Sequence, residues 1–459
     1  MNRKLSANTG YKLGLIDSNT RFYIETIELN RLSALSFFEA GFSYEGERFY
    51  WQNAEKTQTI VGLGHAYVIS NNEHESFESV QAEWDMLCNT IVMEDPEIQP
   101  ILFGGFSFDR QNTLSSEWDE FPDAYFVVPA FQLVLKDDRA YVSINYITGA
   151  DYSAQAFDEL RAERDRLIHA AQVNEWKPFV KPEILSIEER KKQDYLDAVS
   201  SVTGLIRDGR ADKVVIARSL KLTFAEKFNS SAALRSISME QPESYHFGLE
   251  LGSQMFCGAT PERLVKVESG KALSTCLAGS IKRGKTAEED RLLGDVLLND
   301  PKNRGEHQYV VDMISSIFDE YCENYKLPKK PKLLKIRDIQ HLYTPVEGRL
   351  KSNASLFQLV KSLHPTPALG GVPRGLSMEI IRKSEKMDRG YYAAPVGWID
   401  ASGNGEFAVA IRSALLDHDS AYLYAGGGIV ADSEPISEYE ETKVKFRPML
   451  RTFGGKLNG

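Results

Sequence analysis

Short polar turns divide the apolar runs near the C-terminus of this 459-residue chain. The apolar segments Val396–Asp400, Glu406–Leu416 and Ala421–Tyr424 have strand length, and only Ser402–Gly405 and Asp417–Ser420 separate them. Connections this short join antiparallel strands, because parallel strands need a crossover of a dozen or more residues. The pattern therefore predicts an antiparallel meander and argues against a Rossmann series of alternating strands and helices.

The first part of the chain is built in the same way. Residues 20–70 alternate short apolar runs with turns, which indicates antiparallel strands. Two further strands are predicted at Ala124–Leu135 and Arg139–Ile147, and the polar segment Lys136–Asp138 between them suits a hairpin turn. Apolar residues in Asp151–Val173 then recur with helical spacing, so a helix is expected there.

A seam is expected at residues 174–188, which contain two prolines and little periodic pattern. We place an N-terminal β-rich part at 1–175 and a longer part at 190–455, an arrangement that is also compatible with one structural unit. Beyond the seam, the pattern predicts a helix over Gln193–Asp208 and a strand over Lys213–Arg218.

The composition excludes several classes of partner. The formal charge of −11 would repel the phosphates of nucleic acid, and no apolar run is long enough to cross a membrane. Met1–Ser18 lacks the apolar core of a signal peptide. The four scattered cysteines predict neither a zinc site nor a disulfide framework. We therefore expect a cytoplasmic protein, monomeric or homodimeric, that binds neither nucleic acid nor membranes.

Three glutamates are candidates for a metal site. Glu306 is followed by apolar residues at helical spacing, so it lies on the inward face of a predicted helix. A carboxylate facing inward needs a cation, and spacing alone does not separate Mg²⁺ from a basic side chain. Glu438 and Glu441 share one face of a helix predicted at about Pro435–Phe446, but such a pair by itself is more typical of a solvated face.

Three further charged residues have two interpretations each. Arg412 lies beside two alanines on one face of a strand expected over Glu406–Ser413, where it could bind a carboxylate or simply pair with a surface acid. Lys213 begins a strand, which usually means a solvated end, although a lysine enclosed in a cleft can act as a base. Glu262 follows a proline turn, as a helix-capping acid often does.

Ten short motifs, taken in order over Gln193–Leu450, resemble the chorismate-utilising enzymes. They are Lys213–Arg218, Thr260–Arg263, Leu277–Ser280, Gly305–His307, Gln340–Leu342, His364–Ala368, Arg389–Gly390, Pro395–Trp398, Ala410–Arg412 and Ala425–Val430, the last running into Glu438 and Glu441. Each motif is weak alone. Their order over more than half of the chain makes chance agreement implausible.

The resemblance implies an α+β fold, the chorismate-binding fold, in which helices wrap an antiparallel two-sheet core and a cleft binds chorismate with Mg²⁺. Glu306 and Glu441 look like the magnesium ligands, with Glu438 close behind in the same site. Arg412 and Tyr392 are similar to the residues that hold the enolpyruvyl carboxylate. The other substrate-binding positions that the resemblance implies are Gly279, Ser280, His341, Gly426 and Lys445.

Three positions bear on the reaction. Lys213 stands where the hydroxylating members have a lysine that activates water for attack at C2, and Glu262 matches the acid that lets the C4 hydroxyl leave. Ala278 occupies the place where aminodeoxychorismate synthases have a nucleophilic lysine, so no covalent adduct is expected. The resemblance thus implies an isochorismate synthase, an isomerase that works reversibly and needs no glutaminase subunit.

Two alternatives to this assignment remain, one for the reaction and one for the pathway. Salicylate synthases share the lysine and then eliminate pyruvate, but His364–Pro373 looks like the isochorismate synthase version of this segment. Arg374 and Cys276 depart from the lysine and proline that many relatives have, which leaves the shape of the Cys276 loop open. The long N-terminal part is similar to isochorismate synthases of menaquinone biosynthesis, with siderophore biosynthesis as the alternative pathway.

Overall fold

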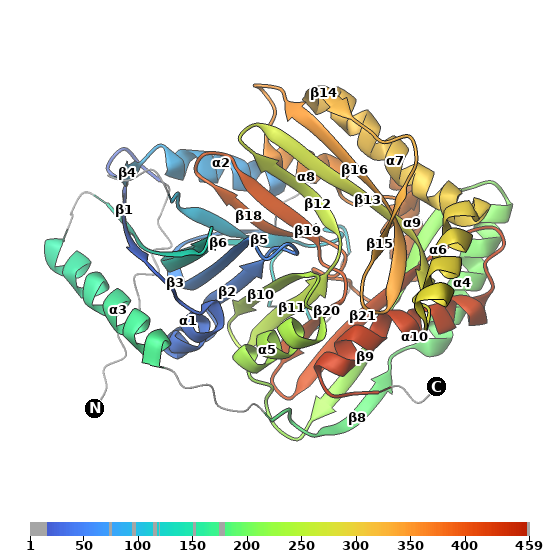
Figure 1. Ribbon diagram of the computed structural model, residues 1–459, viewed down its shortest axis with the longest axis horizontal. Coiled ribbons are helices and arrows are strands. Elements are labelled where there is room, and N and C mark those ends of the chain that lie inside the picture. The colour runs from blue at the N-terminus through green and yellow to red at the C-terminus, as the bar shows by residue number, and fades with distance from the viewer. Residues whose placement is uncertain are drawn as a thin grey trace.

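The chain forms a mixed α+β structure in which helices cover a large sheet system, as predicted (Figure 1). The computed structural model describes residues 16–72, 76–93, 98–112, 117–118, 120–149, 153–173 and 180–456. Among the strand pairs of these residues, only β1 with β4 is parallel, so the antiparallel prediction is confirmed.

Strand β6, Ala124–Lys136, joins two arms of the sheet system. Its first residues pair with β5 (Ile101–Phe106) and its last residues pair with β7 (Arg139–Thr148), while β3 (Gln58–Asn71) pairs with nearly the whole length of β6. The expected two sheets are therefore hydrogen-bonded to each other through this strand. Strands β3 and β5 leave β6 from opposite edges, and the far ends of the two arms that they begin line one cleft.

The first arm contains most of the strands. Its order is β4 (Ile91–Met93), β1 (Arg21–Leu29), β7 (Arg139–Thr148), β6, β3 (Gln58–Asn71), β2 (Arg48–Gln52), β10 (Tyr245–Leu251), β11 (Gln254–Thr260), β20 (Ser413–Asp417), β21 (Ser420–Ile429) and β9 (Lys213–Phe224). Two short strands, β8 (Ile184–Glu189) and β17 (Gly371–Val372), pair with the two ends of β9.

The second arm leaves β6 through β5. Its order is β5 (Ile101–Phe106), β18 (Pro395–Asp400), β19 (Gly405–Val409), β12 (Arg263–Glu268), β13 (Lys271–Lys282) and β16 (Ile339–Leu350), with β14 (Cys322–Lys326) and β15 (Lys332–Lys335) both on β16. The chain passes between the two arms more than once. After β10 and β11 of the first arm it enters the second arm at β12, and it returns to the first arm at β20.

Helices lie over both arms. They are α1 (Ala34–Ala40), the 3₁₀ turn η1 (Phe42–Tyr44), α2 (Ser76–Cys88), α3 (Ala154–Val173), α4 (Lys192–Arg207), α5 (Ser230–Glu240), α6 (Ala287–Asn299), α7 (Pro301–Tyr321), α8 (Leu356–Leu363), α9 (Arg374–Ser384) and α10 (Pro435–Thr452). The helices predicted after residue 190 are confirmed as α4, α7, which carries Glu306, and α10. Asp300 caps α7 by accepting a hydrogen bond from the Asn303 amide, and Pro301 follows at the first helical position.

The hairpin predicted around Lys136–Asp138 is confirmed. Asp137 and Asp138 have φ angles of 52° and 62°, the left-handed values that a two-residue turn between twisted strands requires. The helix predicted over Asp151–Val173 is α3, although Asp151 lies outside the described residues.

The strand predicted over Glu406–Ser413 is wrong in its second half. Strand β19 ends at Val409, β20 begins at Ser413, and Arg412 between them has a φ of 50°. Alternating apolar residues continue through Ile411, so the sequence pattern concealed the break. The break turns the chain from the second arm to the first, and the Arg412 side chain therefore does not share a strand face with the preceding alanines.

The predicted seam contains a strand. Residues 174–179 lie outside the described residues, but Ile184–Glu189 form β8 and pair with β9. Strand pairs also cross the seam, since β2 pairs with β10 and β5 with β18. The two parts proposed from sequence therefore share one set of hydrogen-bonded strands.

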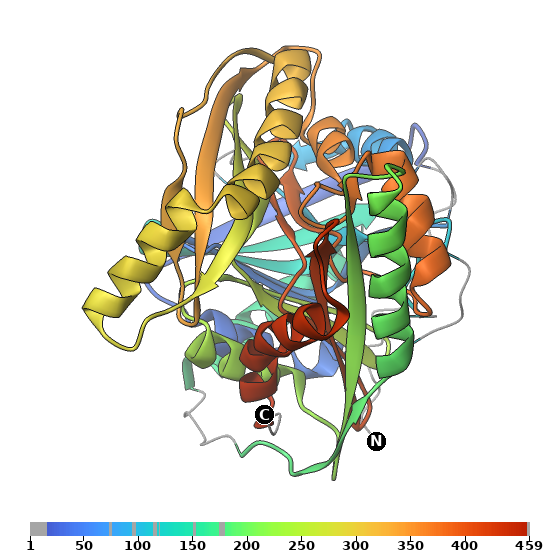
Figure 2. The same ribbon diagram turned by 90° about the vertical axis from the view of Figure 1, so that its right-hand side faces the viewer.

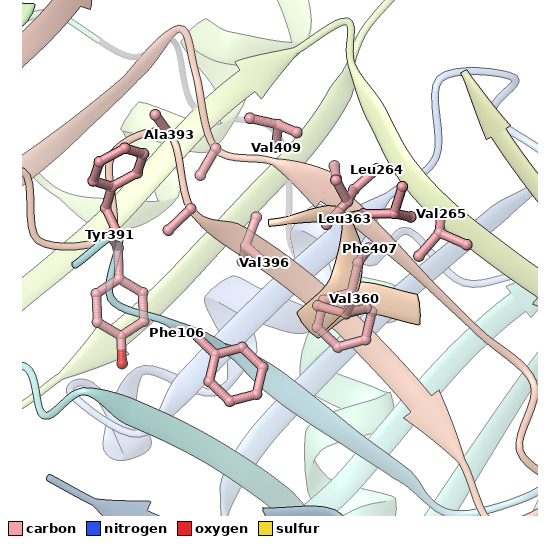
Figure 3. Close-up of a cluster of buried hydrophobic side chains, with 14 of the residues drawn as sticks. Phe106, Leu264, Val265, Val360, Leu363, Tyr391, Ala393, Val396, Phe407 and Val409 are labelled. Carbon is pink, nitrogen blue, oxygen red and sulfur yellow. The ribbon is translucent and has the colours of Figure 1, made fainter. Parts of the chain in front are cut away.

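The main hydrophobic core also includes residues from both parts. Figure 3 shows Phe106 of β5, Val396 of β18 and Phe407 of β19 in one cluster with Val360 and Leu363 of α8. A second buried cluster packs side chains of α1, α3, α5 and α10 against the first arm. Each arm thus has a buried face that depends on residues far apart in sequence.

The sequence predicted no membrane span, no disulfide framework and no signal peptide. No helix there is long and apolar enough to span a membrane. All four cysteines are free thiols, and all but the half-buried Cys88 are buried. Most of the N-terminal segment Met1–Ser18, where no signal peptide was recognised, lies outside the described residues.

We predict that Phe103→Ala lowers the free energy of unfolding by about 3–5 kcal/mol, because Phe103 is fully buried and its ring stacks on Phe49 at 4.4 Å. Since β5 pairs with β18 across the seam, urea unfolding should remain one transition by fluorescence and circular dichroism. The matched control is Phe42→Ala, which removes a ring that is 66% exposed and should change stability little. Two separate transitions would show that the parts fold independently.

Candidate functional site

A cleft of about 240 Å³ lies where the far ends of the two arms approach each other. Strands β9 and β21 of the first arm line one side, and β13 and β16 of the second arm line the other, with α7 and α10 at the border. Figure 2 shows α10, in red, between α6 and α7, in yellow, and α4, in green. Every residue predicted for the site lines this one cleft: Lys213, Glu262, Gly279, Ser280, Glu306, His341, Tyr392, Arg412, Gly426, Glu438, Glu441 and Lys445.

Lys213 is buried at the start of β9, not solvated as a strand end usually is. Its side chain is only 3% exposed, and its Nζ lies 3.6 Å from Oε2 of Glu306 on α7. Burial lowers the pKa of Lys213, and the Glu306 carboxylate opposes this effect. The lysine stem passes close to Gly428 of β21, where an added Cβ would lie 2.5 Å from Cε. This arrangement holds an amine with a weakened affinity for protons inside the cleft.

Glu262 lies between β11 and β12 and is not a helix cap. Its backbone carbonyl accepts a hydrogen bond from the Val409 amide, and its own amide donates to the Thr260 hydroxyl. Burial raises the pKa of Glu262 to about 8, even though Lys213 and Arg412 act to lower it. The carboxyl group is therefore neutral at pH 7 and can donate a proton.

Arg412 reaches the cleft from the break between β19 and β20. Its Nη1 donates to the Lys445 carbonyl at 2.8 Å, which ties the guanidinium to α10. Tyr392 lies nearby on the loop before β18, and its ring stacks on that of Tyr424 with 5.3 Å between centroids. Burial raises the pKa of Tyr392 to about 12, so its hydroxyl stays protonated. These two side chains supply hydrogen-bond donors for an anionic group.

Ser280 and His341 face each other across β13 and β16. The Ser280 Oγ lies 2.7 Å from Nδ1 of His341, just after a bulge in which Gly279 has a φ of +80°. Burial lowers the pKa of His341 to about 3, so the imidazole is neutral. Its Nε2 is buried without a hydrogen-bond partner among the described residues. An unpartnered ring nitrogen on the cleft wall is suited to a ligand oxygen.

The three predicted metal carboxylates enter the cleft from two helices. Glu306 comes from α7, whereas Glu438 and Glu441 come from the first two turns of α10. Glu441 Oε1 lies 2.7 Å from Lys445 Nζ, and this neighbouring charge lowers the pKa of Glu441. Burial raises the pKa of Glu438. The solvated helix face that spacing alone favoured is therefore wrong for Glu438, whose side chain is buried.

The arrangement of these carboxylates suits a divalent cation that keeps water among its ligands better than one that is surrounded by protein ligands. Within the described part of the chain, no three His, Cys, Asp or Glu side chains gather closely enough to surround a metal ion. Mg²⁺ commonly takes one or two protein carboxylates and fills its other positions with water and ligand oxygens. The oxygen donors that face the cleft are therefore of the right kind for Mg²⁺.

Sequence reasoning missed several residues that also line the cleft. Lys302 and Asn303 lie one helical turn before Glu306, a spacing that could have identified them. Asn303 Oδ1 accepts a hydrogen bond from the Ser280 amide at 3.2 Å. Arg389 was recognised only within a motif, but its guanidinium donates to the carbonyls of Val215 and Leu369 and pairs with buried Glu385.

Known proteins resemble this chain over nearly its whole length. The family model described as chorismate binding enzyme matches residues 14–454. The chain is 42% identical over 440 residues to isochorismate synthase MenF of Bacillus subtilis (strain 168), covering 94% of this chain and 93% of that protein. It is 36% identical over 438 residues to the salicylate biosynthesis isochorismate synthase of Pseudomonas aeruginosa, covering 94% and 90%.

A solved structure gives the same fold. MenF, the menaquinone-specific isochorismate synthase from Escherichia coli, superposes with a TM-score of 0.77 and 24% identity, covering 94% of each chain. At this identity the likeness concerns the fold alone.

We predict that Glu262→Gln stabilises the folded chain increasingly as pH rises from about 5 to 9. Because the folded state raises the pKa of this carboxyl to about 8, its stabilising contribution is present at acidic pH and is lost as pH rises through that value. A neutral amide does not ionise. Melting temperatures at pH 5, 7 and 9 measure the effect, with exposed Glu268→Gln as the control. Equal pH dependence in both variants would contradict the assigned pKa.

Proposed function

This chain belongs to the chorismate-binding enzyme family, and we propose that it is an isochorismate synthase, an isomerase that interconverts chorismate and isochorismate. The observation that carries the proposal is a buried lysine and a protonated glutamic acid, Lys213 and Glu262, in one cleft. Identity to two isochorismate synthases over nearly the whole chain supports the same reaction.

The reaction moves a hydroxyl between ring carbons, so one group must take a proton from water and another must give one to the leaving hydroxyl. Lys213, with its lowered pKa, accepts the proton from a water that attacks C2. Glu262, with its pKa near 8, protonates the C4 hydroxyl, which leaves as water. The two roles exchange in the return direction, so the same pair serves both directions of a reversible reaction.

Binding uses the donors that surround this pair. Arg412 and the Tyr392 hydroxyl hold the enolpyruvyl carboxylate, because a guanidinium and a protonated phenol both donate to an anion. The backbone of Gly426 and the cation of Lys445 lie in the same wall of the cleft. The unpartnered Nε2 of His341 contacts a substrate oxygen on the β16 side.

Mg²⁺ is part of the proposal. Glu306 and Glu441, with Glu438 in support, would hold it near the ring carboxylate of chorismate. When bound, the cation would offset the repulsion between an anionic substrate and the carboxylates of the cleft. The oxygen donors on α7 and α10 support this assignment.

Other family reactions fit the residues less well. Ala278 lines the cleft at the position where a nucleophilic lysine would be needed for a covalent adduct. We therefore propose that the enzyme uses water and has no glutaminase subunit. We also propose that it is cytoplasmic. The menaquinone pathway is proposed on the 42% identity to MenF of Bacillus subtilis, which extends through the N-terminal part.

The test of this function is to incubate the purified protein with chorismate in Mg²⁺ or in EDTA, with chromatography of the products and an assay for pyruvate. We predict isochorismate in equilibrium with chorismate, formed only with Mg²⁺ and without pyruvate. Salicylate with an equal amount of pyruvate would instead identify a lyase. Absence of turnover under all conditions would contradict the proposal.

We predict that Lys213→Ala lowers turnover by about 10²- to 10⁴-fold, because it removes the base that activates water. Chorismate binding should persist, since Arg412 and Tyr392 are unchanged, and calorimetric titration can measure it. Lys221→Ala is the matched control, because Lys221 lies on the same strand outside the cleft. Near-normal turnover in Lys213→Ala would remove the assignment of this lysine as the base.

A further inference from the structure

The three carboxylates of the cleft differ in what stabilises them. Glu441 has Lys445 Nζ at 2.7 Å, and Glu306 has Lys213 Nζ at 3.6 Å. Among the described residues, no basic nitrogen lies within 4 Å of the Glu438 carboxylate. Its partner is instead a neutral hydroxyl, that of Ser433, at 2.7 Å from Oε1. Glu438 is thus the buried carboxylate whose charge has no cation in direct contact.

The Ser433 hydroxyl is oriented by its own neighbours. Ser433 is 3% exposed and lies in the turn between β21 and α10. The Val430 amide donates to Ser433 Oγ at 3.1 Å, and the Ser433 amide donates to the Val430 carbonyl at 3.0 Å. Because Oγ already accepts from Val430, its single proton is directed to Glu438.

This bond holds one oxygen of Glu438 and leaves the other available. Oε2 lies against Gly427 of β21, where an added Cβ would be 3.2 Å away. No described residue donates a hydrogen bond to Oε2. Ser433 therefore holds one oxygen of the carboxylate, and the other oxygen faces Gly427 without a hydrogen-bond donor among the described residues.

We propose that Ser433 is a positioning residue for the cation site, because its hydroxyl orients the Glu438 carboxylate without supplying a positive charge. The proposal rests on the proposed function, because it assigns Glu438 to the Mg²⁺ of that reaction. A lysine in the place of Ser433 would compete with the cation for the carboxylate. A neutral donor orients the carboxylate and leaves its attraction for a cation intact.

The proposal is tested with Mg²⁺ itself. Mg²⁺ is titrated into the full-length chain by calorimetry, and its half-saturating concentration is measured in the chorismate assay. Ser433→Ala should weaken Mg²⁺ binding by about 10- to 100-fold, while kcat at saturating Mg²⁺ stays near that of the parent. Ser433→Thr keeps the hydroxyl and should restore much of the affinity. An unchanged Mg²⁺ affinity in Ser433→Ala would overturn the proposal.

A second pair of variants separates positioning from general loss of structure. Ser107→Ala breaks a similar bond, from Ser107 Oγ to Asp123 at 2.8 Å, outside the cleft and should leave Mg²⁺ affinity unchanged. In a Glu438→Gln background, adding Ser433→Ala should cause no further loss of affinity, because the hydroxyl acts through the carboxylate. A further loss there would overturn the proposal. Failure of the parent protein to form isochorismate would instead refute the proposed function.

Discussion

The hydrogen bonding of β6 is the constraint on which the rest of the structure depends. A buried strand must satisfy its backbone donors and acceptors, and β6 does so by pairing with β5 near its start and β7 near its end. Strand β3 pairs along the other edge of β6 and leads to β21 and β9, whereas β5 leads to β13 and β16, and the cleft lies between these two groups of strands. All residues that line the cleft come from Lys213 onward. The N-terminal part supports them through β2 with β10 and β5 with β18.

Within this frame, burial determines the charge of the site. Lys213 and Glu262 would both be ionised in water, but removal from water favours their neutral forms. A neutral amine and a neutral acid are the protonation states that proton transfer to and from a hydroxyl needs. Glu441 differs because the neighbouring Lys445 cation lowers its pKa, whereas burial raises the pKa of Glu438 as it raises that of Glu262. One cleft thus places buried groups for proton transfer beside charged groups for binding.

The sequence predicted the residues of the site more fully than it predicted the local backbone conformation. Ordered motifs identified twelve positions that all line one cleft, since residues for catalysis and binding occur in short recognisable segments. Periodicity found α4, α10 and the β6–β7 hairpin, but it missed the seven-residue helix α1 and the exposed strand β8. It also carried a strand through Arg412, because alternation of apolar residues does not encode a left-handed φ. Spacing did not reveal that Glu306 lies beside Lys213, a contact made only in three dimensions.

The close approach of Gly428 to Lys213 also limits how such a chain can diverge. Any side chain at position 428 would overlap the lysine stem, so the two positions are coupled although only one of them carries a functional group. A methyl group at position 428 would push aside the end of the lysine side chain, and with it the Nζ that lies 3.6 Å from Glu306. Gly428 therefore helps to determine where the amine lies in the cleft, although it carries no functional group of its own.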